Sequence, residues 1–233
     1  MDVFKYGSVV RLAPEAPAPV FTPTDEKSNP GMAMNVQNNI VALGESCDIV
    51  TNTNWQDIHK TRYIHDNTNQ MFIRVDTNDQ EVPRCDVKSI DFMAYEAIII
   101  SDYCKGFLEP EDIQHISLSH PTVFLDTKKK LGSWCGDVKF IKINNYEYEA
   151  SKGHLADTIT DKIIVTLGRR GCLYQGNVYP VEAVDIKDVS GAGDTFLAGL
   201  AVKYVQTSDI ACALEFANDC ATSVVQKKGV STV

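Results

Sequence analysis

The chain has 233 residues, of which 44% are hydrophobic and 23% charged, and its formal net charge is −9. This length suits one domain with a sizeable core, and an acidic chain without a basic stripe is not expected to bind nucleic acid. No apolar stretch approaches the ~20 residues that a membrane-spanning helix needs, so we expect no membrane insertion either.

Cysteine usage predicts a reducing environment. The chain has seven cysteines, an odd number, with no CxxC pair and no signal peptide ahead of them. Its histidines show no zinc-binding spacing such as HExxH. We therefore expect free thiols in a cytoplasmic protein rather than a disulfide scaffold or a zinc enzyme.

The N-terminal third contains one expected helix and several extended segments. Residues 11–23 hold too many prolines for a helix and are expected to form an extended edge segment. Residues 31–44 carry apolar residues at three- and four-residue spacing and end at Gly44, so they predict a helix. Residues 47–52 are expected to form a short strand, and residues 60–76 two strands joined by a turn at DNTN.

From residue 96 onward, short apolar strands alternate with helices. The expected strands are 96–103, 122–128, 137–144 and 162–168, and the expected helices include 109–120 and 145–151. This alternation is typical of a parallel sheet with crossover helices, which binds ligands beyond the carboxyl ends of its strands. The candidate site segments are therefore SDYCKG, DTKK, INNYE, TLGRRG and DVSGAGD.

The stretch DVSGAGDTF (residues 188–196) places two glycines and an aspartate at the start of an apolar helix. Glycines permit close approach of the backbone, and the N–H groups of a helix start attract anions. A carboxylate there, that of Asp194, would repel an anion unless it serves to take a proton. Tight packing of the helix on a sheet accounts for the glycines alone but not for Asp194. A nicotinamide-binding fingerprint is disfavoured because Phe196 stands where its third glycine belongs, and no GxxxxGK[ST] or GxSxG motif occurs.

This stretch resembles the C-terminal signature of the ribokinase-like, or pfkB, family of carbohydrate kinases, which is close to DTxGAGDxF. The resemblance implies an ATP-dependent phosphotransferase with a three-layer α/β/α fold, a mainly parallel central sheet and a small β-lid. It also implies that the backbone N–H groups of Gly191, Ala192 and Gly193 stabilise the transferring phosphoryl group, while Asp194 deprotonates the acceptor hydroxyl.

Two further segments resemble the nucleotide side of that family. NNYE matches its N-x-x-E motif, which implies that Asn144 lies near the phosphates and that Glu147 organises Mg²⁺. A helix start with Asn144 as its cap is an equal alternative. VTLGRRG resembles the family's strand and glycine loop near the nucleotide, although such glycines alone more often form a hairpin turn. The residues implied to lie near ATP here are Thr166, Gly168 and Gly171. Lys128, in the basic run KKK, is a further candidate, although such a run more often forms a solvated loop.

The N-terminal half resembles the branch of the family that phosphorylates heptose 7-phosphate. The matching segments are YGSVVRLAPEAPAPVF, NPGMAMNVQNNIVALG, KTRYIHDNTNQMFIRVD and SDYCKGFL. The resemblance implies that Asp2, Gly31 and Asn35 bind the sugar. Arg62 and Lys105 are candidate partners for a phosphate group, with a plain surface role as the alternative.

The same resemblance suggests a single kinase domain over residues 1–233, in which segments 8–24 and 60–76 form the lid. Such lids exclude water from the reaction, and in this family they often pair two protomers into a homodimer.

Three features depart from the family pattern. Met32 replaces the second glycine of G-G-x-x-N, so a side chain is expected where backbone normally meets the sugar. The chain begins at MDVFKYG, without the family's first strand, and the segment between Gly44 and Lys60 is shorter than usual. These departures concern the sugar side, so we expect phosphoryl transfer with an altered choice of sugar or sugar phosphate. The alternative is a catalytically inactive sugar- or nucleotide-binding regulator.

Overall fold

The computed structural model describes residues 1–79 and 82–233, leaving aside the side chains of Met32, His154 and Asp157. The chain divides into two compact units. Unit 1 comprises Met1–Gly31 and Thr53–Val82, and unit 2 comprises Met32–Asn52 and Pro83–Val233. The expected intrusion of the Met32 side chain therefore lies outside the described part of the structure.

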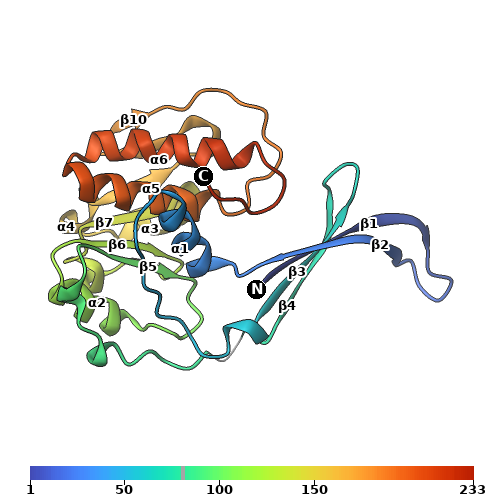
Figure 1. Cartoon of the computed structure of the whole chain (residues 1–233), viewed down its shortest axis with the longest axis horizontal. Helices are drawn as coiled ribbons and strands as arrows, with labels where there is room; N and C mark the ends of the chain where they lie inside the picture. The colour runs from blue at the N-terminus through green and yellow to red at the C-terminus, as the bar shows by residue number, and fades with distance from the viewer. Residues whose placement is uncertain (80–81) are drawn as a thin grey trace. The chain divides into compact units, whose positions relative to one another are not determined.

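Unit 1 is built on a four-stranded sheet in the order β2-β1-β3-β4 (Figure 1). Its strands are β1 (Asp2–Leu12), β2 (Pro19–Asn29), β3 (His59–His65) and β4 (Met71–Thr77). Strand β1 pairs antiparallel with β2 and parallel with β3, and β3 pairs antiparallel with β4. The two strands expected within 60–76 are confirmed, and both segments predicted to form a lid fall in this unit.

The proline-rich segment 11–23 is not one extended segment, as had been expected. Strand β1 ends and β2 begins within it, and the connection is closed by a hydrogen bond from Ala13 N to Ala18 O (2.8 Å). Pro14 and Pro17 lie in this connection, where a missing N–H removes no bond between strands. Pro14 and Pro17 thus mark the turn between the two strands, whereas Pro19 and Pro23 belong to β2.

Unit 2 contains a six-stranded sheet in the order β10-β9-β8-β7-β6-β5. Its strands are β5 (Ile98–Asp102), β6 (Val123–Thr127), β7 (Phe140–Asn144), β8 (Ile163–Thr166), β9 (Cys172–Tyr174) and β10 (Asn177–Tyr179). Strands β5 to β8 run parallel, and β9 and β10 continue the sheet antiparallel. The four strands expected from the apolar runs, and the mainly parallel sheet, are confirmed. All five residues of β6 are buried, as a strand covered on both faces requires.

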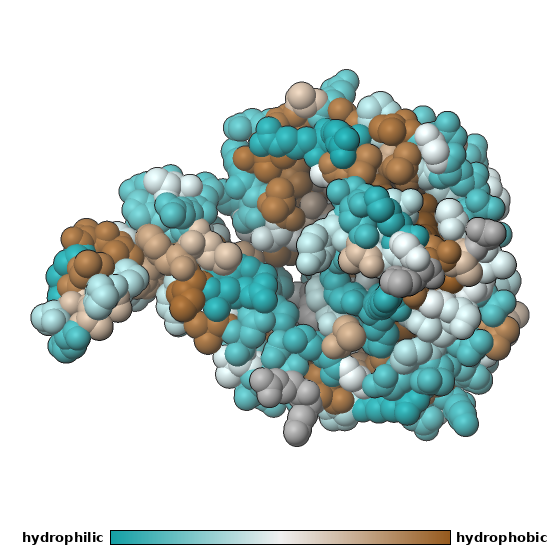
Figure 2. All heavy atoms as spheres, turned by 180° about the vertical axis from the view of Figure 1, so that it is seen from behind, coloured by the Kyte–Doolittle hydropathy of each residue, from teal (hydrophilic) through white to brown (hydrophobic). Residues whose placement is uncertain are grey.

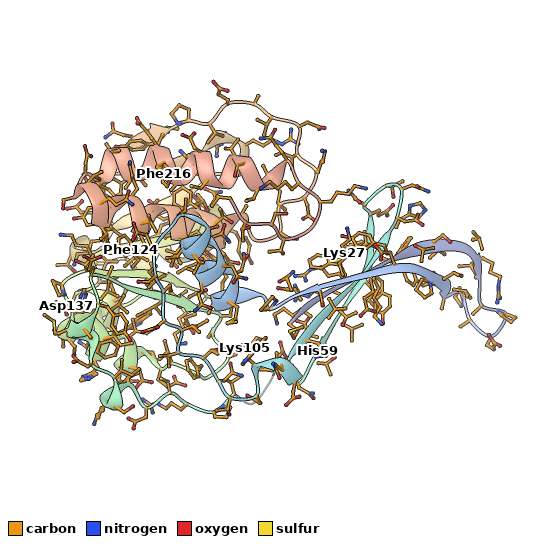
Figure 3. All side chains as sticks on the ribbon, in the orientation of Figure 1. Lys27, His59, Lys105, Phe124, Asp137 and Phe216 are labelled. Carbon is orange, nitrogen blue, oxygen red and sulfur yellow. The ribbon has the colours of Figure 1, made fainter. Side chains whose placement is uncertain are left out.

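Helices cover both faces of this sheet, which gives the expected three-layer α/β/α fold. The helices are α1 (Met32–Ala42), α2 (Pro110–Ser119), α3 (Asn145–Ser151), α4 (Asp157–Thr160), α5 (Ala192–Thr207) and α6 (Ile210–Val225). Phe124 of β6 packs in one core cluster with α1, α5 and α6 (Figure 3). Its neighbours Val123 and Leu125 belong to a second cluster, with α2 and α4. Adjacent strand residues thus face opposite helical layers.

Two further segments differ from the sequence analysis. Residues 47–52 form no strand; Cys47 O accepts a hydrogen bond from the side-chain Nε2 of Gln37 (2.7 Å), not from a neighbouring strand. Helix α6 (Ile210–Val225) lies in a segment for which the sequence analysis predicted no helix. The helix expected over 31–44 is confirmed as α1, followed by Gly44 with the positive φ of +91° that is common after a helix end. Among the described residues, no helix combines the length and the apolar character needed to cross a bilayer.

Candidate active site

The start of α5 contains two glycines whose missing side chains permit close contacts. Gly191 has φ +79°, and a Cβ built on it would lie 2.7 Å from Asn35 Nδ2. A Cβ on Gly193 would lie 2.8 Å from Lys142 Nζ. Thr195 N donates to Gly191 O (2.9 Å) as the first helical hydrogen bond, so the N–H groups of Gly193 and Asp194 precede the helical ladder. This end of the helix, with a lysine beside it, favours an anion.

Asp194 is buried at this helix start, with 7% of its surface exposed. Its Oδ2 accepts a hydrogen bond from Asn35 Nδ2 (2.9 Å), and its Oδ1 accepts one from the Tyr103 hydroxyl (3.2 Å). Burial raises the pKa of Asp194 to about 6, although the Asn35 hydrogen bond and the charge of Lys142 act in the opposite direction. Both hydrogen-bond donors are neutral, so the carboxylate keeps the capacity to take a proton near neutral pH.

Asn35 is itself held in place by the neighbouring turn of α1. Asn39 Nδ2 donates to Asn35 O (2.8 Å) and approaches Asn35 Oδ1 (3.4 Å). Asn39 Oδ1 in turn accepts from the backbone N of Val233 (3.2 Å). The amide of Asn35 is therefore oriented with its nitrogen toward Asp194, which positions this carboxylate.

A chain of alternating charges lies at the carboxyl ends of β6 and β7. Lys142 Nζ is 2.6 Å from Asp126 Oδ2, and both side chains are 6% exposed. Lys128 Nζ lies 2.5 Å from Glu147 Oε1 and 3.7 Å from Asp126 Oδ1. Although burial alone would lower the pKa of Lys128, the carboxylates of Asp126 and Glu147 raise it. The ammonium of Lys128 is therefore held by these two carboxylates, while the Nζ of Lys142 lies against Gly193 at the start of α5.

Asn144 and Glu147 form a capping box at the start of α3. Asn144 Oδ1 accepts from Glu147 N (2.9 Å), and Glu147 Oε2 accepts from Asn144 N (2.8 Å). Asn144 therefore caps helix α3, as the alternative interpretation of this motif predicted. The capping box leaves Glu147 Oε1 facing Lys128, so the same carboxylate also takes part in the charged chain.

The loop after β8 contains the remaining residues predicted to lie near a nucleotide. Thr166 ends β8 and pairs with Asn144 of β7 in the sheet, so these two predicted residues are neighbours. Gly168 and Gly171 both have positive φ and join β8 to the antiparallel β9, which is the hairpin alternative. A Cβ on Gly171 would lie 2.0 Å from Tyr179 O, whereas one on Gly168 would meet nothing within 4 Å.

The predicted sugar-binding residues divide between the two units. In unit 1, Arg62 Nη1 lies 2.5 Å from Asp2 Oδ1, and a Cβ on Gly31 would lie 2.6 Å from Asp2 Oδ2. In unit 2, Asn35 contacts Asp194, and Lys105 lies in the loop after β5 (Figure 3). The structure thus brings Asp2, Gly31 and Arg62 together as one group.

Three residues of this site had no predicted role: Tyr103, Asp126 and Lys142. Tyr103 directly follows β5, whereas Asp126 and Lys142 lie within β6 and β7. The segments SDYCKG and DTKK, which contain Tyr103 and Asp126, had been marked as candidate site segments. Lys142 carries the clearest signal, because a lysine inside the buried run FIKIN is unusual unless it is paired. Their convergence on one aspartate is a tertiary property.

The chemistry of the donor set suits a hard cation such as Mg²⁺. Asp126 Oδ1 is a buried carboxylate oxygen without a hydrogen-bond partner among the described residues. Together with Glu147 it supplies two carboxylates, and Mg²⁺ needs only one or two beside water and phosphate oxygens. In the described ranges, no group of three or more His, Cys, Asp or Glu side chains is placed to hold a metal. A metal bound to Asp126 and Glu147 would therefore take its other ligands from water and phosphate oxygens.

Comparisons with known proteins give a family and a fold. The sequence model of the pfkB family of carbohydrate kinases matches residues 46–233. The bifunctional protein HldE of Helicobacter pylori strain J99 is 30% identical over 283 residues, covering 98% of this chain and 61% of that protein. HldE of Hydrogenovibrio crunogenus is 28% identical, covering 100% of this chain and 59% of that protein. The chain therefore spans about three fifths of the length of these curated relatives.

Solved structures share the fold at low sequence identity. Ribokinase from Thermotoga maritima superposes with a TM-score of 0.71 at 14% identity, covering 98% of this chain and 91% of that one. Ribokinase from Arabidopsis thaliana, complexed with ribose and ATP, gives a TM-score of 0.64 at 15% identity, with coverages of 98% and 90%.

Proposed function

The chain belongs to the pfkB family of carbohydrate kinases, and we propose that it transfers the γ-phosphoryl group of ATP to a hydroxyl group of a sugar or sugar phosphate. The proposed acceptor is the hydroxyl at the 1-position of heptose 7-phosphate. This choice rests on the resemblance of the N-terminal half to the heptose branch of the family.

The observation that carries the proposal is the environment of Asp194. A buried carboxylate with a pKa near 6 and two neutral hydrogen-bond donors is suited to accept the proton of a sugar hydroxyl. A positioned base of this kind contributes a rate factor of about 10² to 10⁴. Tyr103 and Asn35 would keep the carboxylate oriented while the proton moves to it.

The backbone at the start of α5 supports the phosphoryl side of the reaction. Phosphoryl transfer needs mainly positioning and charge stabilisation, because charge is spread over the transferring oxygens. Of the predicted N–H groups, that of Ala192 donates to Val189 O (3.3 Å), so we assign this role to the N–H group of Gly193 and add that of Asp194. With the ammonium of Lys142 against Gly193, these groups would supply positive potential beside the base. Asp194 would thus take the acceptor's proton, while the N–H groups and Lys142 would stabilise the phosphoryl charge at the same helix start.

Nucleotide and metal would be held by the neighbouring strand ends. We assign the phosphates of ATP to Asn144 and the loop from Thr166 to Gly171, and Mg²⁺ to Asp126 and Glu147. Bound there, Mg²⁺ would neutralise charge on the nucleotide phosphates. Asp126 is an addition to the predicted metal residue Glu147, supported by its unpartnered buried oxygen.

The acceptor would be bound by Asp2, Gly31 and Asn35, and Arg62 and Lys105 are the candidates for contact with its phosphate group. The ion pair between Arg62 and Asp2 fixes both side chains in unit 1, which supports a joint role in sugar binding. Within unit 2, the hydrogen bond from Asn35 to Asp194 supports a role of Asn35 beside the base.

The proposal is tested by ADP release from ATP and Mg²⁺ with a panel of heptose and hexose phosphates. An active chain shows acceptor-dependent ADP release, and Asp194→Asn loses it while still binding ATP in a calorimetric titration. Absent turnover over the whole panel, with ligand binding intact, would instead support the inactive binding protein.

We further propose a homodimer formed through the sheet of unit 1, and a cytoplasmic location. Apolar side chains are exposed on this unit (Figure 2), including Leu12, Met71, Ile73 and Val75. Such exposure on a small sheet favours a covering partner. The seven free cysteines fit a reducing compartment. Sedimentation analysis of Ile73→Glu tests the dimer, since a charge at that position would shift the mass to a monomer.

A further inference from the structure

The ammonium group of Lys128 occupies the position between two carboxylates that would hold a divalent cation. Its Nζ lies 2.5 Å from Glu147 Oε1 and 3.7 Å from Asp126 Oδ1. The other oxygen of each carboxylate is committed elsewhere: Asp126 Oδ2 to Lys142, and Glu147 Oε2 to the backbone N of Asn144. The two remaining oxygens therefore face the same cation.

This arrangement differs from a surface ion pair. Asp126 is 4% exposed, and its Oδ1 has no hydrogen-bond partner among the described residues. A buried carboxylate oxygen of this kind is strongly unfavourable unless a cation or a donor reaches it. At 3.7 Å, Lys128 compensates its charge only partly.

We propose that Lys128 is a built-in competitor for the divalent metal, and that its ammonium has to leave the Asp126–Glu147 pair before Mg²⁺ binds there. The inference rests on the proposed function, which supplies the reason for a metal at this position. Mg²⁺ and an ammonium a few ångströms apart repel each other, so the two cations exclude one another from the shared oxygens.

Lys128 is able to leave, whereas its neighbour Lys142 is not. The side chain of Lys128 is 35% exposed, and its flexible stem allows the ammonium to move into water. The side chain of Lys142 is 6% exposed and fixed at 2.6 Å from Asp126. Lys142 therefore remains as a permanent counter-charge, and Lys128 is the exchangeable one.

The test is Mn²⁺ binding to the nucleotide-free and sugar-free chain, followed by electron paramagnetic resonance. Lys128→Met is compared with the wild type and with Lys130→Met, a matched control that removes the same charge from an exposed residue two positions away. We expect Lys128→Met to bind Mn²⁺ at least about tenfold more tightly, because a cation at contact distance is removed. Lys130→Met should change the affinity by less than about threefold, since exposed charges are screened by salt.

A double variant identifies the site. Asp126→Asn combined with Lys128→Met should lose the gain, because the buried oxygen no longer carries charge. Equal affinities for Lys128→Met and Lys130→Met would overturn the proposal. Circular dichroism checks that each variant is folded, and Lys128→Gln, which keeps a polar side chain, provides a second neutral variant. Because no ATP or sugar is present, failure here leaves the ADP-release test of the kinase proposal unaffected.

Discussion

Replacement of Asp194 by asparagine should stabilise the protein while it abolishes the proposed reaction. Asparagine keeps the shape of aspartate but does not ionise. Its carbonyl oxygen can accept from Asn35 Nδ2, and its Nδ2 can donate to the Tyr103 hydroxyl, which rotates to accept. The variant therefore satisfies both contacts without a buried charge.

The magnitude follows from the pKa of Asp194. Burial raises this pKa from 3.8 to about 6, and one unit corresponds to about 1.4 kcal/mol, so the ionised side chain costs about 3 kcal/mol of folding free energy well above pH 6. The folded chain holds this proton more tightly than the unfolded chain, so the contribution of Asp194 to stability falls as the pH rises from about 4 to above 6. Asparagine does not ionise, so the variant does not lose this stability as the pH rises.

Urea unfolding at several pH values measures the difference. Trp134 lies in unit 2, and Trp55→Phe removes the tryptophan fluorescence of unit 1, so the tryptophan signal reports on the unit that contains Asp194. We expect Asp194→Asn to be more stable by about 1 to 3 kcal/mol at pH 7.5, with the advantage shrinking toward pH 5. An equal or lower stability at pH 7.5, without this pH dependence, would refute the burial argument.

Two further predictions use matched substitutions. Tyr103→Phe removes a hydrogen bond to the ionised form of Asp194, so the rising limb of the pH profile of kcat/KM should move upward by about half to one pH unit; an unchanged midpoint would mean that Tyr103 does not act on the base. Gly171→Ala should lower the free energy of unfolding by about 3 kcal/mol or more, because its Cβ meets a backbone oxygen, whereas Gly168→Ala should cost only about 1 kcal/mol for its positive φ. Urea titrations of both variants check this order, and equal losses would contradict the steric explanation.

The fold was predictable because its signals are local. Continuous β-branched runs alternating with helices require a sheet covered on both faces, and the structure has one. The start of α5 was predictable for a similar reason: positive φ at Gly191 and the orientation of helix N–H groups are properties of a few consecutive residues. The apolar residues of segment 47–52 predicted a strand that does not form. There the backbone oxygen of Cys47 accepts a hydrogen bond from the Gln37 side chain instead of from a neighbouring strand.

The surroundings of Asp194 were decided only by the tertiary structure. Tyr103 is 91 residues away in sequence and Asn35 is 159 residues away, so no spacing rule could bring either to this carboxylate. The same holds for Lys142 and Asp126, which meet because neighbouring parallel strands end side by side. The sequence by itself determined which backbone could receive an anion and which acid stood beside it. Folding alone set the pKa of that acid and the cations around it, because desolvation and charge interactions depend on distances in space rather than along the chain.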